Sequence, residues 1–462
     1  MPARGRRTFI IGAGCTAFIK PRGQREVEDM GLEAATKALL DAGITYDSVE
    51  AAYVGYCYGE STSGQRALYN LGLTGIPITN VNNNCSTGST AMYNANNLVK
   101  AGLAECTLAL GFERMRPGSL KSNWTDRRSP GALLSDANAE AEHNISTGEN
   151  HGPGAPRMFA NAAQEYMDKY GATVEHLAKI ASKNHKHSVN NPYSQFRDGW
   201  SVEQILNAPK INKQLTKFMC SPTSDGAACC IIASEDFVHA HGLENQAIEI
   251  VSQAMTTDDP SAFESRRPMN VVGYGMTKAC ADKVFADAGF APGAGRDQVG
   301  VVELHDCFSA NELITYEALG LCASGEAHKM VDRGDNTYGG KYVVNPSGGL
   351  EAKGHPLGAT GLGMHFYIAM QLREWAGPMQ APGLFDVPDK RGKYGLVQNI
   401  GLGGAVVCSL LRRPEFYKPG RPDGRDRLGY NHACECRPVT MADVNKVKSK
   451  KSSQFVLAAA KL

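Results

Sequence analysis

The sequence lacks any long hydrophobic run. Hydrophobic residues make up 42% of its 462 positions, yet no apolar stretch approaches the roughly 18–20 residues that a membrane-spanning helix needs. We therefore expect no membrane span. The first residues, MPARGRRTFIIGAG, are basic, but their apolar part is short and interrupted by glycine, which favours a first strand over a signal peptide.

An excess of one charge is also missing. The 48 Lys and Arg residues almost balance the 47 Asp and Glu residues, and the net charge is +1, which argues against a nucleic-acid-binding protein. The 13 cysteines are dispersed and odd in number, which favours reduced thiols inside a cell over a disulfide framework. Glycine is abundant instead, and its 50 residues predict many tight turns or close backbone contacts.

Two kinds of site lack the residues that they require. RGDNTYGGK (residues 333–341) does not have the arrangement of a phosphate-binding loop. HACEC (residues 432–436) has possible ligand spacing but no four-ligand set, so no metal is expected. We expect His185 and His187 to be solvated.

A weak internal repeat organises the chain. ALLDAGITYDSVEAAYVGYC (residues 38–57) and VFADAGFAPGAGRDQVGVVELHDC (residues 284–307) each read as a helix ending at Ala-Gly, a turn, and a strand ending at a cysteine. A Gly-containing loop, a helical pattern and an apolar strand follow each copy. Strands that alternate with helices, twice over, predict two similar α/β units with mixed sheets. A chance likeness of short α/β segments is the alternative reading.

The repeat predicts the domain boundaries. We expect an N-terminal half from residues 1–116 and 224–252, and a C-terminal half from residues 253–413. Residues 117–223, which are polar and loop-rich with helical patches at 161–170 and 176–184, read as an inserted loop domain. Residues 414–462 form a polar, basic tail that is expected to fold poorly on its own.

Cys85 and His355 occupy equivalent places in the two copies. Cys85 follows ITNVNNN and opens an Ala-rich helix, where the helix dipole can lower the pKa of a thiol. Gly88 would let the backbone approach a ligand closely. His355 lies in KGHPLGATG, also before a helix, and could take a thiol proton. A buried structural cysteine and a surface histidine are the alternatives.

Two further segments carry candidate groups. Cys307 lies in LHDCFSANEL at the end of a strand, beside His305 and Asp306, and is either structural or a second reactive thiol. The segment NIGLGG places Gly401 where backbone N–H groups could hold an oxyanion. A β-bulge or a bend in the sheet is the alternative for this glycine cluster.

These motifs together resemble the thiolase superfamily. VNNNCSTGSTAM, NPSGGLEAKGHPLGATG and QNIGLGGAVV are similar to its nucleophile, Gly-His-Pro and closing segments, and the likeness runs from Arg7 to Arg412. HDCF, VDRGDNTYGGK and NHKHSVNNPYSQF are most similar to the thiolase part of sterol carrier protein X. The resemblance implies a five-layered αβαβα fold from two repeated halves with an inserted loop domain, in a homodimer.

The resemblance also implies a reaction. It is the cleavage of a 3-oxoacyl-CoA by CoA to an acyl-CoA plus acetyl-CoA or propionyl-CoA, as in fatty acid β-oxidation, through an acyl group on Cys85. CoA and acyl-CoA are then the substrates, and the residues that contact CoA are not assigned. A biosynthetic condensing thiolase is the alternative enzyme. An inactive acyl-CoA-binding scaffold is the non-enzymatic alternative.

The same resemblance implies residue roles. His355 draws off the thiol proton of Cys85. Most members carry an acid/base cysteine where this chain has Asn399, and the role therefore passes to Cys307. His305 would bind one thioester oxygen together with His355, and the backbone N–H groups of Cys85 and Gly401 would bind the other oxygen.

The chain ends suggest a location. Ala460-Lys461-Leu462 is similar to the Ser-Lys-Leu address read by the peroxisomal import receptor, which predicts a peroxisome or a glycosome-like organelle. Arg4, Arg6 and Arg7 leave a mitochondrial destination as the alternative.

Overall fold

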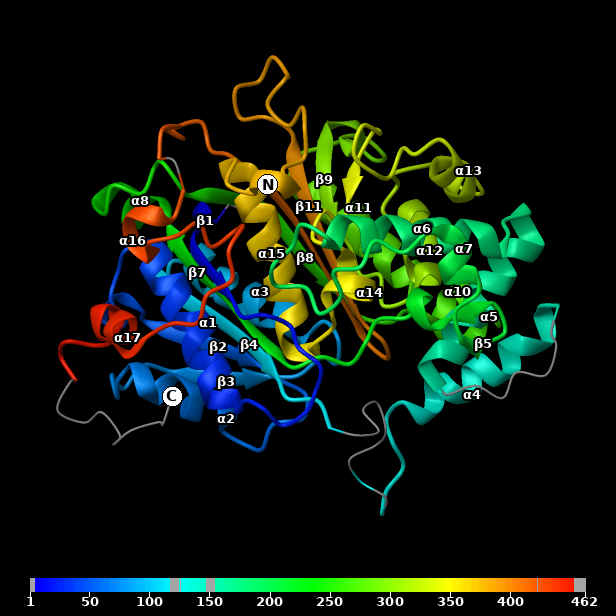
Figure 1. Cartoon of the computed structure of the whole chain (residues 1–462), viewed down its shortest axis with the longest axis horizontal. Coiled ribbons are helices and arrows are strands. Elements are labelled where there is room, and N and C mark those ends of the chain that lie inside the picture. Colours follow the sequence, from blue (N-terminus) through cyan, green and yellow to red (C-terminus); the bar gives the residue numbers. More distant parts are fainter. Residues whose placement is uncertain (1–4, 117–123, 125, 147–153, 422, 453–462) are drawn as a thin grey trace.

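Ten strands form one sheet through the middle of the molecule (Figure 1). The computed structural model describes residues 5–116, 124, 126–146, 154–421 and 423–452. The strand order is β3-β2-β4-β7-β1-β8-β12-β11-β9-β10. The strands are β1 (Thr8–Cys15), β2 (Ala51–Gly55), β3 (Ile78–Val81), β4 (Cys106–Glu113), β7 (Gly226–Ser234), β8 (Ile248–Thr256), β9 (Val299–Glu303), β10 (Val343–Val344), β11 (Tyr394–Gly401) and β12 (Ala405–Arg412).

The strand order has the same pattern on either side of the central β1–β8 pair. In the first half β2 runs parallel to β3 and β4, and β4 pairs with β7 antiparallel. In the second half β9 likewise runs parallel to β10 and β11, and β11 pairs with β12 antiparallel. The halves join where β1 pairs with β8. The predicted repeat of two similar mixed α/β units is confirmed.

Helices cover and separate the two halves of the sheet. α1 (Val27–Ala42) packs on the outer face of the first half and α11 (Tyr274–Asp287) on that of the second. α3 (Thr87–Lys100) and α15 (Leu357–Arg373) contact each other and strands of the sheet, and they form the middle layer (Figure 1). The layers follow the order αβαβα, and this fold prediction is confirmed. The chain turns sharply after the outer helices, because Gly43 and Gly289 take φ of 70° and 94°.

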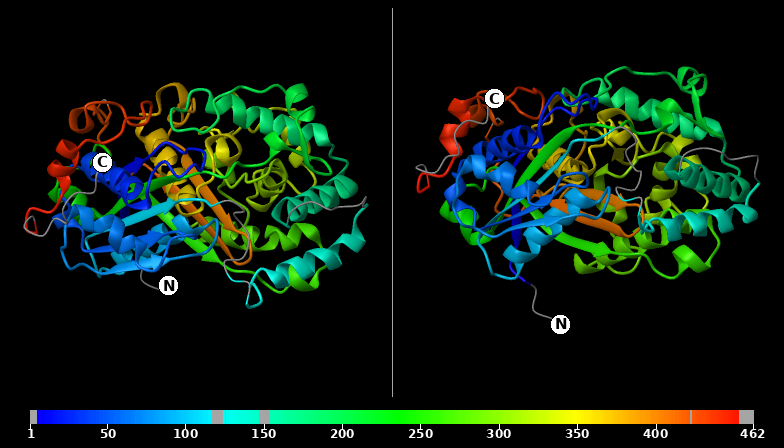
Figure 2. Two further views of the ribbon diagram at one scale, coloured as in Figure 1. Left: turned by 60° about the horizontal axis from the view of Figure 1, so that its bottom comes forward. Right: turned by 90° about the horizontal axis from the view of Figure 1, so that it is seen from below.

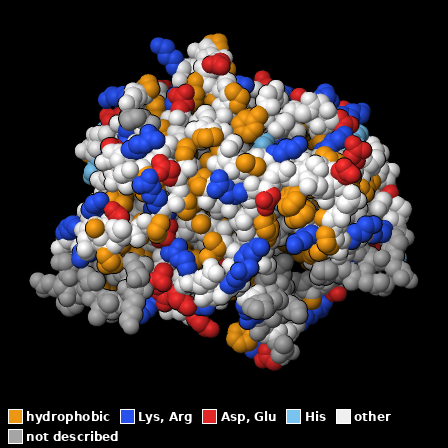
Figure 3. Space-filling view, viewed as in Figure 1, with side chains coloured by type: hydrophobic (Ala, Val, Ile, Leu, Met, Phe, Trp, Pro, Cys, Tyr) orange, Lys and Arg blue, Asp and Glu red, His pale blue; other side chains and the backbone are white. Residues whose placement is uncertain are grey.

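Shorter helices complete the two halves. They are α2 (Ser63–Leu68), α8 (Glu235–Ala240), α9 (Ser261–Glu264), α10 (Pro268–Val271), α12 (Ser309–Ala318), α13 (Ala327–Asp332) and α14 (Gly349–Lys353). No described helix is long and apolar enough to cross a bilayer. On the face drawn in Figure 3, Lys and Arg side chains are interspersed with acidic and hydrophobic ones, in keeping with the nearly balanced charge.

The segment between β4 and β7 lies on the side opposite the first half, where Figure 2 shows it in cyan and green. It contains α4 (Ala132–Ala141), α5 (Gly154–Tyr170), α6 (Val174–Ser188), α7 (Val202–Leu206), β5 (Lys210–Asn212) and β6 (Leu215–Thr216). The two helical patches expected here fall within α5 and α6. The prediction of solvated His185 and His187 is wrong: they are 0% and 7% exposed, because α6 packs against α12 and α14.

The described part of the tail folds against the first half. α17 (Met441–Val447) packs on α1, and Val444 and Val447 are buried there. α16 (Arg425–Leu428) also contacts α1, and the ring of Phe416 lies 5.3 Å from that of Phe9. The poor folding that composition suggested is therefore corrected for residues 414–421 and 423–452. Ala460, Lys461 and Leu462 lie outside the described residues.

Asp41, at the end of α1, is the anchor of this packing. Its carboxylate is fully buried, and it accepts hydrogen bonds from Arg373 Nη1 (2.7 Å) and from the Ala13 amide (2.9 Å). His432 Nε2, from the HACEC segment, lies 3.7 Å away. Burial opposes ionisation, yet Arg373 and His432 hold the pKa of Asp41 far below its usual value. The HACEC histidine thus faces a carboxylate.

We expect Asp41→Asn to be strongly destabilising. The substitution leaves the Arg373 guanidinium buried without its counter-charge, a change that costs about 3–5 kcal/mol in similar sites. Urea unfolding followed by circular dichroism measures the loss. The matched control is Asp287→Asn, which breaks the exposed Lys283–Asp287 pair of α11 and should cost less than about 0.5 kcal/mol. Equal effects of the two substitutions would contradict the anchoring role.

Candidate functional site

Three segments that are far apart in the chain meet at one point. Cys85 precedes α3, His305 follows β9, and His355 precedes α15. One ligand atom from each of these three residues lies within 4.8 Å of the other two. The two imidazole rings are 5.0 Å apart and nearly perpendicular, at 84°. The structure therefore brings together three of the residues that the sequence singled out.

Close backbone packing between α3 and α15 produces this meeting. A Cβ on Gly88 would lie 2.7 Å from the Gly358 carbonyl oxygen, and one on Gly361 would lie 2.4 Å from the Ser89 nitrogen. Any larger residue would push the helix N-termini apart. Gly88 was expected to let the backbone approach a ligand closely. In the structure it lets α15 pack closely against α3. The glycines thereby set Cys85 beside His355.

The surroundings of Cys85 favour the protonated form of its thiol. Asn84 takes a left-handed φ of 49°, and α3 begins three residues later, at Thr87. Burial, and then the negative charge of Glu113, raise the pKa of Cys85 to about 12, although the backbone amides of Cys85 and Leu402 act in the opposite direction. The expectation of a lowered pKa is wrong, because desolvation outweighs the helix N-terminus. The resting sulfur is a thiol that needs a base.

His355 is arranged as a hydrogen-bond acceptor. Thr360 Oγ1 donates to the Pro356 carbonyl (3.0 Å), so it accepts from His355 Nδ1 at 2.7 Å. This assigns the ring proton to Nδ1. Nε2 then carries a lone pair, and it is buried with no hydrogen-bond partner among the described residues. Burial and the charge of Lys353 lower the pKa of His355 to about 3, so the ring is neutral and its Nε2 can take a proton.

His305 has the opposite arrangement and presents a donor. Asn399 Nδ2 donates to His305 Nδ1 (2.9 Å) and to the Cys85 carbonyl (3.1 Å), so the proton of the His305 ring is on Nε2. Burial, together with His355 and Lys353, lowers the pKa of His305 well below its usual value. Its backbone N–H donates to Gln398 Oε1 at 3.0 Å. Two neutral imidazoles in opposite tautomers thus flank Cys85.

Gly401 borders the same point, and Cys307 lies close enough to Cys85 for one thiol to influence the other. Cys307 is 7% exposed, and burial, followed by the influence of Cys85, raises the pKa of its thiol well above the usual value. A Cβ on Gly401 would lie 2.1 Å from the Asn83 carbonyl oxygen, so the end of β11 touches the turn that carries Cys85. Asn84 Nδ2 donates to the Leu402 carbonyl at 2.9 Å and closes this contact.

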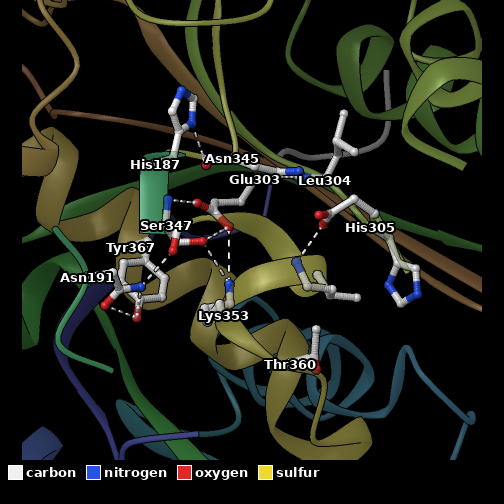
Figure 4. Close-up of polar contacts among 12 residues, drawn as sticks. His187, Asn191, Glu303, Leu304, His305, Asn345, Ser347, Lys353, Thr360 and Tyr367 are labelled. Atoms are coloured by element: carbon white, nitrogen blue, oxygen red, sulfur yellow. Dashed lines mark hydrogen bonds and ion pairs between the residues drawn. The ribbon is translucent and has the colours of Figure 1, made fainter. Parts of the chain in front are cut away.

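A fully buried ion pair supports the two histidines. Lys353 Nζ lies 3.3 Å from Glu303 Oε2, and both side chains are 0% exposed. Ser347 completes the group: its hydroxyl donates to Glu303 (2.8 Å) and accepts from Lys353 (3.0 Å), as Figure 4 shows. Glu303 ends β9 two residues before His305, and Lys353 ends α14 two residues before His355. The pair therefore links the segments that carry the two rings.

The chain is similar to known proteins over most of its length. Residues 8–206 match the family model "Thiolase, N-terminal domain" and residues 263–402 match "Thiolase C-terminal domain-like". Sterol carrier protein 2 of Rattus norvegicus is 53% identical over 414 residues, which are 88% of this chain and 72% of that protein. Non-specific lipid-transfer protein-like 2 of Caenorhabditis elegans is 44% identical, over 88% of this chain and 96% of that one.

This chain belongs to the thiolase family. The resemblance inferred from the sequence is confirmed, and the membership supports an acyltransferase. A crystal structure of human mitochondrial 3-ketoacyl-CoA thiolase in complex with CoA is similar in fold, with a TM-score of 0.61 and 19% identity, over 88% of this chain and 98% of that one.

The candidate site contains groups that sequence reasoning did not identify. Glu113, at the end of β4, is buried and accepts backbone hydrogen bonds from Cys57 (3.0 Å), Tyr58 (3.0 Å) and Gly358 (3.1 Å). Burial raises its pKa to about 7. Asn399 was noted only as a departure from the family pattern, and Lys353 only as part of the motif KGHPLGATG. The signal available for Glu113 was an acidic residue at the end of an apolar strand pattern, Cys106–Glu113.

We expect Glu113→Gln to speed alkylation of Cys85 in alkali but not in acid. At pH 8 Glu113 is ionised and raises the pKa of Cys85, so its removal should increase the rate of iodoacetamide labelling about three- to tenfold. At pH 5.5 Glu113 is already protonated and the two proteins should react alike. Mass spectrometry of the Cys85 peptide measures the rates, and thermal unfolding checks the fold. A rate ratio independent of pH would contradict the assignment.

Proposed function

We propose that this chain is a thiolase that cleaves a 3-oxoacyl-CoA with CoA, giving a shortened acyl-CoA and acetyl-CoA or propionyl-CoA, as in fatty acid β-oxidation. One observation carries the proposal: a thiol, an imidazole with a free acceptor nitrogen and an imidazole with a donor N–H lie within 4.8 Å of one another. That set suits formation of an acyl-cysteine beside a thioester oxygen. The thiolase relatives support the substrate class.

The first half-reaction transfers the acyl group to Cys85. Its sulfur attacks the 3-keto carbon while the thiol proton passes to His355 Nε2. The resulting oxyanion is held by the backbone N–H groups of Cys85 and Gly401. The C2–C3 bond then breaks, its electron pair passes to the departing thioester as an enolate, and the Cys307 thiol donates a proton to C2. His305 Nε2–H and protonated His355 face the enolate oxygen.

The second half-reaction restores the site. The Cys307 thiolate takes the proton of an incoming CoA thiol, and the CoA sulfur attacks the acyl carbon on Cys85. The Cys85 thiolate leaves and recovers its proton from His355. Cys85 recovers its own proton from His355, and the proton that Cys307 gave to C2 is replaced by the proton of the CoA thiol. The cycle therefore needs no external acid or base.

The resting electrostatics support a coupled first step. Cys85 holds its proton because its pKa is raised to about 12, and His355 is neutral because its pKa is lowered to about 3. A free thiolate–imidazolium pair is therefore disfavoured before substrate binds. Proton transfer becomes favourable as the C–S bond forms and charge moves to an oxygen held by preorganised donors.

The two cysteine variants should fail in different ways. Cys85→Ala should lose acyl-enzyme formation and thiolysis together, by at least about 10⁴-fold, because it removes the nucleophile. Cys307→Ala should still transfer an acyl group from acyl-CoA to Cys85, but lose carbon–carbon cleavage about 10²–10⁴-fold. Intact-protein mass spectrometry detects the acyl group, and loss of the acetoacetyl-CoA enolate absorbance in the presence of CoA measures cleavage.

A third thiol provides the control. Cys434 is partly buried and donates to the Trp375 carbonyl at 3.5 Å, away from Cys85, so Cys434→Ala should behave as wild type in both assays. Normal cleavage by Cys307→Ala would refute its acid/base role. Absence of any Cys85 acyl adduct in the wild type would refute the proposed function and favour a binding scaffold.

Assembly and location stay predictions. The homodimer can be checked by light scattering. The peroxisomal location, proposed from the likeness of Ala460-Lys461-Leu462 to an import address, can be checked by fluorescence microscopy of a version that ends before Ala460. The mitochondrial alternative predicts that this version keeps its location.

A further inference from the structure

We infer that Cys85, His305 and His355 also form a reversible binding site for a borderline-soft divalent cation, of which Zn²⁺ is the natural representative. Among the described residues they are the one group of three His, Cys, Asp or Glu side chains whose ligand atoms approach so closely, within 4.8 Å of one another. One thiolate and two imidazoles are the donors that Zn²⁺ prefers.

The distances require only small movements. In a tetrahedral zinc site with bonds of about 2.0–2.3 Å, neighbouring ligand atoms lie roughly 3.5 Å apart. Rotation of the Cys85 side chain and tilting of the rings can supply the remaining ångström or so. Cys85 keeps some exposed surface, which gives a cation and a fourth ligand access to the sulfur.

His355 is already oriented as a metal ligand. A metal-bound histidine almost always donates its second ring N–H to an oxygen, and here Nδ1 donates to Thr360 Oγ1 at 2.7 Å. Nε2 is buried, lacks a hydrogen-bond partner in the described structure and offers its lone pair. This unpartnered nitrogen is the second observation, besides the clustering, that points to a ligand.

His305 needs a proton shift, and Asn399 can accommodate it. Ligation through Nε2 moves the ring proton to Nδ1, which now faces the Asn399 amide nitrogen at 2.9 Å. Asn399 Oδ1 is buried and has no partner in the described structure, so a turn of the amide lets this oxygen accept the Nδ1 proton. The turn gives up the hydrogen bond to the Cys85 carbonyl, a cost that the new metal bond must exceed.

The surroundings of Cys85 are favourable for a cation. Cys85 releases its proton and becomes a thiolate when the metal binds, and the Glu113 carboxyl lies close enough to influence that sulfur. Lys353 is paired with Glu303, which offsets part of the positive charge that lies near the two histidines. The bound metal blocks the sulfur that the proposed function uses, and the predicted consequence, which rests on that function, is inhibition reversed by a chelator.

Co²⁺ is the probe that tests the site directly, because a cobalt–thiolate bond gives an ultraviolet charge-transfer band without turnover. We expect wild type to bind one Co²⁺ with this band, and Zn²⁺ to displace it. Cys85→Ala should lose the band. His305→Asn retains an N–H donor but removes a metal ligand, and it should weaken Co²⁺ binding at least tenfold.

Cys57→Ala is the matched control. Cys57 Sγ lies 3.3 Å from the Asn84 carbonyl oxygen, next to Cys85 in space, but it is not part of the three-ligand group, so this variant should bind Co²⁺ as wild type does. Circular dichroism establishes that each variant is folded. A missing band in wild type, a band that survives Cys85→Ala, or unchanged affinity in His305→Asn would each overturn the inference.

The acyl-transfer assay, run with a chelator present, keeps the two proposals apart. Acylation of Cys85 without cobalt binding would refute the metal site and leave the thiolase function standing. Cobalt binding without acylation of Cys85 would refute the thiolase function and leave the metal site standing.

Discussion

The buried pair of Glu303 and Lys353 is the interaction on which the site depends. Each residue lies two positions before a histidine, so one ion pair sets the spacing of the segments that carry His305 and His355. Both charges are fully removed from water, and such a pair is tolerated only when each partner stays in place. Ser347 binds both charges and leaves little freedom for either. The same lysine helps to lower the pKa of both rings, so the pair controls their charge as well as their position.

Neutrality of the rings lets one residue type perform two opposite tasks. Thr360 fixes the proton of His355 on Nδ1, and Asn399 fixes the proton of His305 on Nε2. One ring therefore accepts a proton and the other donates a hydrogen bond, although they are 5.0 Å apart. A protonated ring could not act as the base, and two identical tautomers would leave either the sulfur or the substrate oxygen without its partner.

The sequence predicted the parts of this arrangement that repeat or cluster locally. The two copies were recognisable because helices ending at Ala-Gly precede strands that end two residues before Cys57 and four residues before Cys307. The motifs around Cys85 and His355 marked the two helix starts. The pKa shifts and the burial of individual side chains could not be predicted from the sequence. The pKa of Cys85 depends on burial and on Glu113, which comes from another strand, and the burial of His185 and His187 depends on packing against distant helices. Composition likewise described the tail as polar, whereas its described part packs on α1, where Arg427 donates to the Asp41 carbonyl, 386 residues away in the chain.

The two halves also brace each other in a way that only the structure reveals. At the end of β4 in the first half, Glu113 accepts a hydrogen bond from Gly358 at the start of α15. At the end of β11 in the second half, Asn399 donates to the carbonyl of Cys85 beside the start of α3. Each half thus holds the helix start of the other, but through an acidic acceptor in one case and an amide donor in the other. Glu113 raises the pKa of Cys85, whereas Asn399 sets the tautomer of His305. Divergence at this pair of strand ends therefore gives the two related halves different electrostatic roles around one site.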